Sequence, residues 1–171
     1  MNLFTAVTAD AVLINRLDPN EPLGTCSMHG FELEDLYWPS AEHYYQATKY
    51  EGKLRESIRT SDHPRTARRL GRNIFKRKRP DWKKIKVTVM TRAIYTKCKT
   101  HQEVADALMA TEDKPLASNA FGEYYWGVGR DGRGKNQYGK ILQRVREKLR
   151  SESQEYLETK TSRKEGQSES A

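Results

Sequence analysis

The sequence contains no long hydrophobic run. Hydrophobic residues make up 36% of its 171 residues, and the mean hydropathy is −0.93. No stretch approaches the roughly 20 consecutive apolar residues that a membrane-spanning helix requires, and the first residues lack the basic start and the cleavage region of a signal peptide. We therefore expect a cytoplasmic protein without a membrane segment.

Cysteine is also scarce. Cys26 and Cys98 are far apart and form no CxxC pair, and the four histidines are scattered rather than grouped at the spacing of metal ligands. Neither a zinc site nor a disulfide framework is indicated. We expect two reduced thiols and no metal site.

Acidic residues are nearly absent from one window of the chain. Between Pro64 and Lys99 there are 14 basic residues and a single acid, Asp81, so this 64–99 basic window carries a formal +13 in a chain of net charge +8. The remaining residues therefore carry −5. Concentrated positive charge favours anionic partners, and we expect the window to bind polyanions; a solvated helix face is the alternative.

The length favours one domain, and the element order predicts a mainly α fold of the α+β class, with a few short strands, over residues 1–150. The residues after Arg150 have almost no apolar side chains, so we expect a disordered polar tail over residues 151–171. Periodicity and capping signals predict helices at 41–50, 52–60, from 64, 81–94, 101–109 and from about 136, with short strands at 11–14, 31–38 and 114–119.

The first candidate for chemistry is the predicted helix that follows Ser40. Glu42 and Lys49 are seven positions apart, which places them on one helix face with Tyr45 and Gln46 between them. A lysine near other cations has a lowered pKa, and its neutral amine can attack a carbonyl carbon. The alternative is an ordinary solvated amphipathic face.

A second candidate is the glycine-rich segment from Gly122 to Lys140. Such a loop lets backbone N–H groups approach a phosphate, and Asn136 can cap the helix that follows. Tyr125 and Trp126, with Glu123 close by, suggest a stacking platform beside a carboxylate. A plain connector is the alternative for this loop. Trp82, in the basic window, suits either stacking on a base or simple core packing.

These segments together resemble a known family. In unbroken order from about Leu23 to Leu149, they are similar to the NADAR family, close to the N-glycosidases of riboflavin-biosynthesis intermediates. The motifs that carry the resemblance are PSAEHYYQATKY, ARRLGR, DWKKIKVTVMTRAI, LMATEDKPLASN, YWGVGRDGRGKNQYGKIL and VREKL.

The resemblance implies hydrolysis of a C–N bond between a ribosyl carbon and an amine or base, by a compact, mainly helical fold without a cofactor. Family members act on early phosphoribosylamino-pyrimidine intermediates of riboflavin synthesis, and others remove ADP-ribose from guanine in nucleic acid. The family's helix glutamate corresponds to Glu42 and its lysine to Lys49, which forms a Schiff base in the ADP-ribosyl-guanine hydrolases. Its other motif residues correspond to Arg72, Trp82, Trp126, Gly127, Gly134 and Asn136.

Two positions depart from the family pattern. Ser118 stands where members usually carry an acid in the strand before the loop, and Glu123 replaces an aspartate three residues before the Trp-Gly pair. A carboxylate is therefore kept at the second position and lost at the first. Both departures bear on substrate choice.

Two chemical routes are open for such a site. Glu42 and Glu123 can stabilise positive charge at the anomeric carbon and activate water, or Lys49 can capture the ring-opened sugar as an imine. Stacking is expected from Tyr45, Trp82 and Trp126, and phosphate binding from Arg72 and the loop N–H groups. The rival hypothesis is a non-catalytic module that binds ADP-ribose or nucleic acid.

Overall fold

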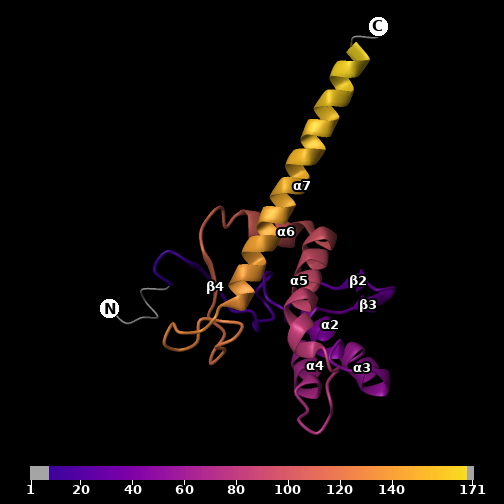
Figure 1. The fold of residues 1–171 in the computed structure, drawn as a ribbon, viewed down its shortest axis with the longest axis vertical. Helices are drawn as coiled ribbons and strands as arrows, with labels where there is room; N and C mark the ends of the chain where they lie inside the picture. The colour runs from indigo at the N-terminus through magenta and orange to yellow at the C-terminus, as the bar shows by residue number, and fades with distance from the viewer. Residues whose placement is uncertain (1–7, 169–171) are drawn as a thin grey trace.

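The computed structural model describes residues 8–168, with side chains described up to Lys160. Its helices and short strands confirm the mainly α fold with a small β component (Figure 1). In chain order the elements are β1 (Val12–Ile14), β2 (Phe31–Leu33), β3 (Leu36–Trp38), α2 (Ala41–Ala47), α3 (Gly52–Arg59), α4 (Pro64–Gly71), α5 (Trp82–Thr100), α6 (Gln102–Met109), β4 (Leu116–Ser118) and α7 (Gln137–Ser168).

The strands form two small sheets. β2 and β3 pair as an antiparallel hairpin, whereas β1 and β4 pair in parallel, with Val12 opposite Leu116 and Ile14 opposite Ser118. The parallel pair joins segments about a hundred residues apart in the sequence. It therefore sets the segment after β1 beside the segment after β4.

Helix α2 lies in the interior. The Ser40 hydroxyl accepts a hydrogen bond from the His43 N–H and so caps the helix, as the sequence predicts. All seven residues of α2 are buried, and α3, α4 and α5 pack around it. A solvated face is therefore excluded for Glu42 and Gln46, which need partners within the protein.

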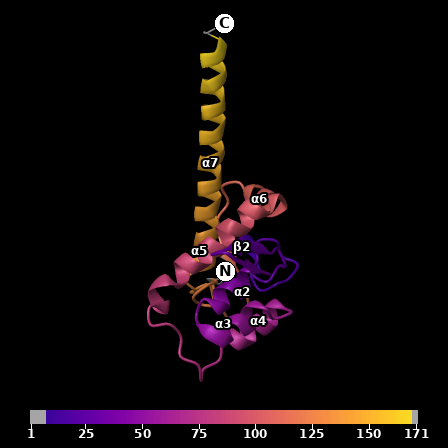
Figure 2. The same cartoon turned by 90° about the vertical axis from the view of Figure 1, so that its right-hand side faces the viewer.

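Helix α5 lies between the elements near the N-terminus and those near the C-terminus: it packs against α2 and β2 as well as against α6 and α7 (Figures 1 and 2). Its inward face carries Val89, Met90, Ala93 and Ile94, all buried, as the amphipathic period predicts. None of the helices described in residues 8–168 is long and apolar enough to cross a bilayer.

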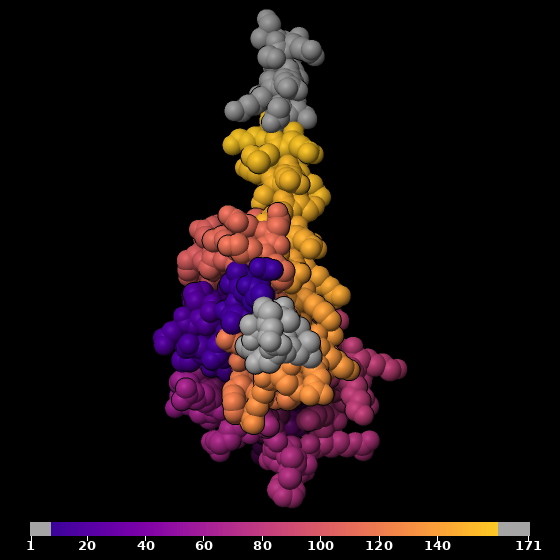
Figure 3. All heavy atoms as spheres, turned by 90° about the vertical axis from the view of Figure 1, so that its left-hand side faces the viewer, coloured from indigo at the N-terminus to yellow at the C-terminus, as the bar shows by residue number. Residues whose placement is uncertain are grey.

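Helix α7 continues into the segment for which the sequence predicts a disordered polar tail. It runs to Ser168 and stands clear of the domain (Figures 1 and 2), and the part before residue 161 already projects in the space-filling view (Figure 3). Residues 169–171 of the predicted tail lie outside the described residues. A helix satisfies its own backbone hydrogen bonds, so a segment with few apolar residues can remain helical. The Lys148–Glu152 pair at 3.0 Å supports its first exposed turn, and Glu152 also accepts a hydrogen bond from the Tyr95 hydroxyl.

Candidate active site

The candidate cleft lies between α2, α4 and the loop that follows β4, and has a volume of about 480 Å³. It combines residues from five separate parts of the chain. The lining residues are Arg16, Tyr45, Gln46, Lys49, Arg68, Arg72, Lys78 and the loop residues from Phe121 to Trp126.

Arg16 joins the two carboxylates that the sequence indicates. Its side chain is 1% exposed; its Nε and Nη2 donate to the two oxygens of Glu123 at 2.6 and 2.7 Å, and its Nη1 donates to Glu42 at 3.2 Å. The two glutamates also pull the pKa of the Arg16 guanidinium upward against the effect of burial. Arg16 therefore stays charged.

Glu42 is fully buried and does not line the candidate cleft. The Thr25 hydroxyl and the Gln46 amide each donate to it at 2.6 Å, and Arg68 lies 3.5 Å away. Burial alone would raise the pKa of this carboxyl, but Arg16, these hydrogen bonds and Arg68 together lower it below its ordinary value. Glu42 is thus a fixed negative charge behind the wall of the cleft.

Glu123 is the carboxylate that reaches the candidate cleft. Its side chain is 12% exposed, and Arg68 donates to it at 3.0 Å in addition to the two bonds from Arg16. Two guanidinium groups therefore hold the carboxylate in one orientation.

Lys49 presents its amine in the same cleft. Its Nζ donates to the Gln46 amide oxygen and, at 3.1 Å, to the Gly71 carbonyl oxygen. None of the ion pairs found within residues 8–168 includes Lys49. Burial lowers the pKa of this amine to about 7; Glu42 opposes the change, while Lys78, Arg68 and Arg16 add to it.

Aromatic rings surround the amine. It lies 5.0 Å from the centre of the Tyr45 ring and 5.7 Å from that of Trp82. Tyr45 packs edge-on against Trp126, with ring centres 5.5 Å apart. Tyr45 and Trp126 line the cleft, whereas Trp82 is 7% exposed and lies behind Tyr45, outside the lining.

After Gly127 the glycine-rich loop folds back on itself through backbone hydrogen bonds. The N–H groups of residues 128, 129 and 134–138 all donate to carbonyl oxygens of the loop or of Ser118. A Cβ on Gly134 would lie 2.1 Å from the Gly127 carbonyl oxygen, and one on Gly127 would lie 2.5 Å from that of Ser118. Both glycines therefore permit close backbone contact outside the cleft.

Asn136 differs from its expected capping role. It has a positive φ of 48°, and its side chain bridges the backbone of β4: Oδ1 accepts from the Ser118 N–H at 3.0 Å and Nδ2 donates to the Leu116 carbonyl oxygen at 2.8 Å. Asn136 thus fixes the end of the loop to the strand and does not line the candidate cleft.

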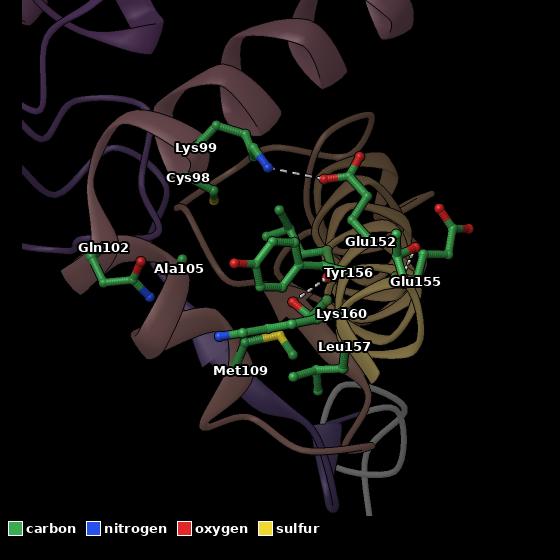
Figure 4. Close-up of a pocket in the computed structure, with 13 residues that line it drawn as sticks. Cys98, Lys99, Gln102, Ala105, Met109, Glu152, Glu155, Tyr156, Leu157 and Lys160 are labelled. Atoms are coloured by element: carbon green, nitrogen blue, oxygen red, sulfur yellow. Dashed lines mark hydrogen bonds and ion pairs between the residues drawn. The ribbon is translucent and has the colours of Figure 1, made fainter. Parts of the chain in front are cut away.

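A larger cleft of about 1000 Å³ lies elsewhere, between α5, α6 and the projecting part of α7 (Figure 4). Its lining includes Met109, Tyr156 and Leu157, and it contains none of the residues that the sequence marks for chemistry. Neither cleft holds a cluster of metal ligands, because no group of three His, Cys, Asp or Glu side chains suited to a metal occurs in the described part of the chain.

Sequence reasoning did not find Arg16, Thr25 or Arg68. Arg16 and Thr25 lie in an irregular segment without periodicity, and Arg68 is one of 14 basic residues in its window. Gln46 is recognisable only as a neighbour of Glu42 and Lys49. No spacing signal marks Arg16, Thr25 or Arg68; only their contacts do.

The comparisons with known proteins agree with this architecture. The NADAR domain model matches residues 15–150. N-glycosidase YbiA of Escherichia coli K12 is 40% identical over 119 residues, which cover 69% of this chain and 74% of that protein. A riboflavin biosynthesis protein of Vibrio vulnificus is 39% identical over 113 residues, covering 66% of this chain and 31% of that protein.

A solved structure shares the fold. The NMR structure of E. coli YbiA superimposes with a TM-score of 0.76 at 32% sequence identity, covering 91% of this chain and 96% of that one. The family match spans both carboxylates, the lysine and the residues that hold them. The chain belongs to the NADAR family.

Proposed function

We propose that the candidate cleft hydrolyses the C–N bond between a ribosyl carbon and an amine or base, with Lys49 as the nucleophile and Glu123 as the carboxylate beside the reacting carbon. The chain is a hydrolase of N-glycosyl bonds, the class to which its relatives named N-glycosidase belong. The observation that carries the proposal is an amine with a pKa of about 7, held in an aromatic-walled cleft without a carboxylate partner in the described residues.

The lysine route accounts for every atom. An N-ribosylamine opens its ring to an iminium, the Lys49 amine adds to C1′, and the base leaves with a proton, so that an imine joins C1′ to Nζ. Water then adds to this imine, and the amine departs to leave the free sugar. The net reaction consumes one water and releases the ribose and the amine or base.

In this route Glu123 stabilises the positive charge that forms on the sugar. Positive charge develops at C1′ when the ring opens, and a carboxylate held by Arg16 and Arg68 is already oriented to stabilise it. Glu42 acts from behind the cleft, through Arg16 and Gln46, because no part of it reaches the lining.

The rim of the cleft favours an anionic substrate. Arg72 and Lys78 line it, and both side chains are exposed. Phosphate groups meet such cations readily. Both substrate types that the family resemblance implies, a phosphoribosylamino-pyrimidine and an ADP-ribosylated guanine in DNA, carry phosphate next to the ribose.

The test is to incubate the protein with each of these two substrates and to detect released base and sugar by mass spectrometry. Borohydride added during turnover should trap a sugar adduct on Lys49, because only an imine is reduced to a stable bond. Lys49→Ala should abolish turnover and trapping, whereas Lys53→Ala, an exposed lysine of α3, should change neither.

Two results separate the routes. A Lys49→Ala variant that is inactive, with a wild type that gives no adduct, favours water attack assisted by Glu123. A Lys49→Ala variant that keeps nearly the wild-type rate refutes the assignment of the nucleophile.

A non-catalytic binding module is the second candidate, favoured by the exposure of most basic side chains in the 64–99 basic window. It predicts tight binding of nucleic acid or ADP-ribose with no release of base or ribose from either substrate. Release of product from either one excludes it.

A further inference from the structure

The Gln46 side chain lies between the buried glutamate and the lysine amine. It is 1% exposed, its Nε2 donates to Glu42 at 2.6 Å, and its Oε1 accepts from Lys49. An ionised carboxylate only accepts hydrogen bonds, so Glu42 fixes which end of the amide faces it. The amide oxygen must therefore face Lys49.

This orientation determines the geometry of the lysine amine. A neutral amine has two N–H groups and one lone pair, and Lys49 Nζ has two acceptors, the Gln46 amide oxygen and the Gly71 carbonyl oxygen. When both N–H groups are so used, the remaining tetrahedral direction is that of the lone pair. Lys49 lines the candidate cleft, so a substrate carbon bound there can approach the amine along this direction.

The charges around the amine are compatible with its neutral form. Glu42 on α2 favours the ammonium form but is already engaged by other donors, while Arg68 on α4, Lys78 before α5 and Arg16 after β1 all disfavour it. The hydroxyl of Tyr50 also donates to the Gly71 carbonyl oxygen, at 3.1 Å.

Helix α4 leaves the space that Gln46 needs. A Cβ on Gly71 would lie 2.3 Å from the Gln46 amide oxygen and 2.6 Å from its Cβ. Any side chain at position 71 would therefore displace the amide. The same residue supplies the second acceptor for Lys49, so Gly71 both makes room for Gln46 and completes the hydrogen bonding of the amine.

We propose that Gln46 is a positioning residue that, oriented by Glu42 and accommodated by Gly71, holds the Lys49 amine with its lone pair open to the cleft. The inference rests on the proposed function, in which Lys49 is the nucleophile. It assigns Gln46 no contact with the substrate. Its effect is on the attack step and not on binding.

The experiment compares imine formation with the intrinsic reactivity of the amine. Wild type, Gln46→Met and Gly71→Ala are incubated at pH 7 with ribose 5-phosphate and borohydride, and the reduced adduct on Lys49 is measured by peptide mass spectrometry. In parallel, methyl acetimidate, a small amidinating reagent, measures how much of the amine is neutral and accessible. Gln102→Met, on the exposed surface of α6, is the matched control substitution.

We expect the trapping rate to fall about tenfold or more in Gln46→Met and Gly71→Ala, because small displacements of a reacting group cost one to two orders of magnitude in rate. Amidination should stay equal or increase, since the lost amide oxygen stabilised the ammonium form. On a substrate that the wild type cleaves, kcat should fall while KM stays within about twofold.

Two outcomes overturn the inference. One is trapping and kcat at wild-type levels in both variants; the other is trapping that changes only in proportion to amidination, which would mean that Gln46 tunes the pKa or the exposure of the amine. If Gln46→Met does not fold, Gly71→Ala carries the same test with Gln46 intact. Failure of the proposed function is recognised separately, by a wild type that traps ribose 5-phosphate but cleaves no N-ribosyl substrate.

Discussion

Removing Arg16 should destabilise the protein more than removing any arginine on its surface. Arg16→Met keeps most of the side-chain length but deletes the guanidinium, which leaves Glu42 and Glu123 with Arg68 as their remaining cation. Arg16 is 1% exposed and Glu42 is fully buried. Two carboxylates that share one partner near the interior cannot both remain ionised without cost.

The size of the expected loss in unfolding free energy follows from the burial of the Arg16–Glu42 ion pair. Breaking a buried ion pair by deleting one partner costs about 3–5 kcal/mol. Each kcal/mol lowers the melting temperature by about 2–4 °C in a chain of this size, so we expect a decrease of about 6–20 °C. Arg92→Met is the matched control: Arg92 pairs with Glu34 at 2.6 Å but is 48% exposed, and its loss should cost about 1 kcal/mol or less.

The pH dependence of this stability loss shows whether it comes from the lost charge of Arg16 or from the lost packing of its side chain. Arg16 helps to lower the pKa of Glu42 below its ordinary value of 4.5, so the stability that Glu42 contributes is present above that value and is lost as the pH falls through the folded-state pKa. Without Arg16, burial raises the pKa of Glu42. The stability deficit of Arg16→Met should therefore be full at pH 7 and should shrink as the pH falls from the raised pKa of Glu42 in the variant towards its lowered pKa in the wild type.

The assay is urea unfolding followed by circular dichroism at pH 7 and pH 4 for wild type, Arg16→Met and Arg92→Met. A deficit of the same size at both pH values would attribute the loss to packing and refute the electrostatic explanation. A deficit at pH 7 no larger than that of Arg92→Met would refute the structural role of the network itself.

Further predictions concern the loop, the strand, the basic window and the helical extension. Gly134→Ala should cost several kcal/mol in urea unfolding, because its Cβ would lie 2.1 Å from a backbone oxygen; a change below about 1 kcal/mol would contradict the packing explanation. Ser118→Ala should leave the melting temperature unchanged or slightly raised, since the buried Ser118 hydroxyl has no hydrogen-bond partner among the described residues. Affinity for a DNA oligonucleotide should fall steeply between about 50 and about 200 mM salt, because cations that neutralise phosphates release bound counterions. An affinity that does not change with salt would mean that the 64–99 basic window is only a solvated face. A chain ending at Glu152 should melt within about 1 °C of the full chain, because the side chains from Ser153 to Lys160, which it lacks, are exposed; a larger decrease would indicate tertiary contacts of the extension.

The sequence by itself determined the local elements and the residues that share a helix face. Ser40 marks the start of α2, and Glu42 and Gln46, four positions apart, share a face of it. The predicted helix over 41–50 is too long, because α2 ends at Ala47; Lys49 lies in the turn that follows and still contacts Gln46. The apolar period of α5 and the buried residues at the start of α7 follow equally from helical geometry. These features depend on neighbours within about two turns, which a sequence pattern records.

Only the tertiary structure decided which residues complete the site. Arg16 and Glu123 are 107 positions apart and meet because β1 pairs with β4, a contact that no local pattern encodes. The same packing buries Glu42 behind the cleft and leaves Glu123 at its wall, although the sequence presents them as equivalent carboxylates. Burial, partner and direction are properties of the assembled fold, because the dielectric surroundings and hydrogen-bond donors of a side chain come from distant segments.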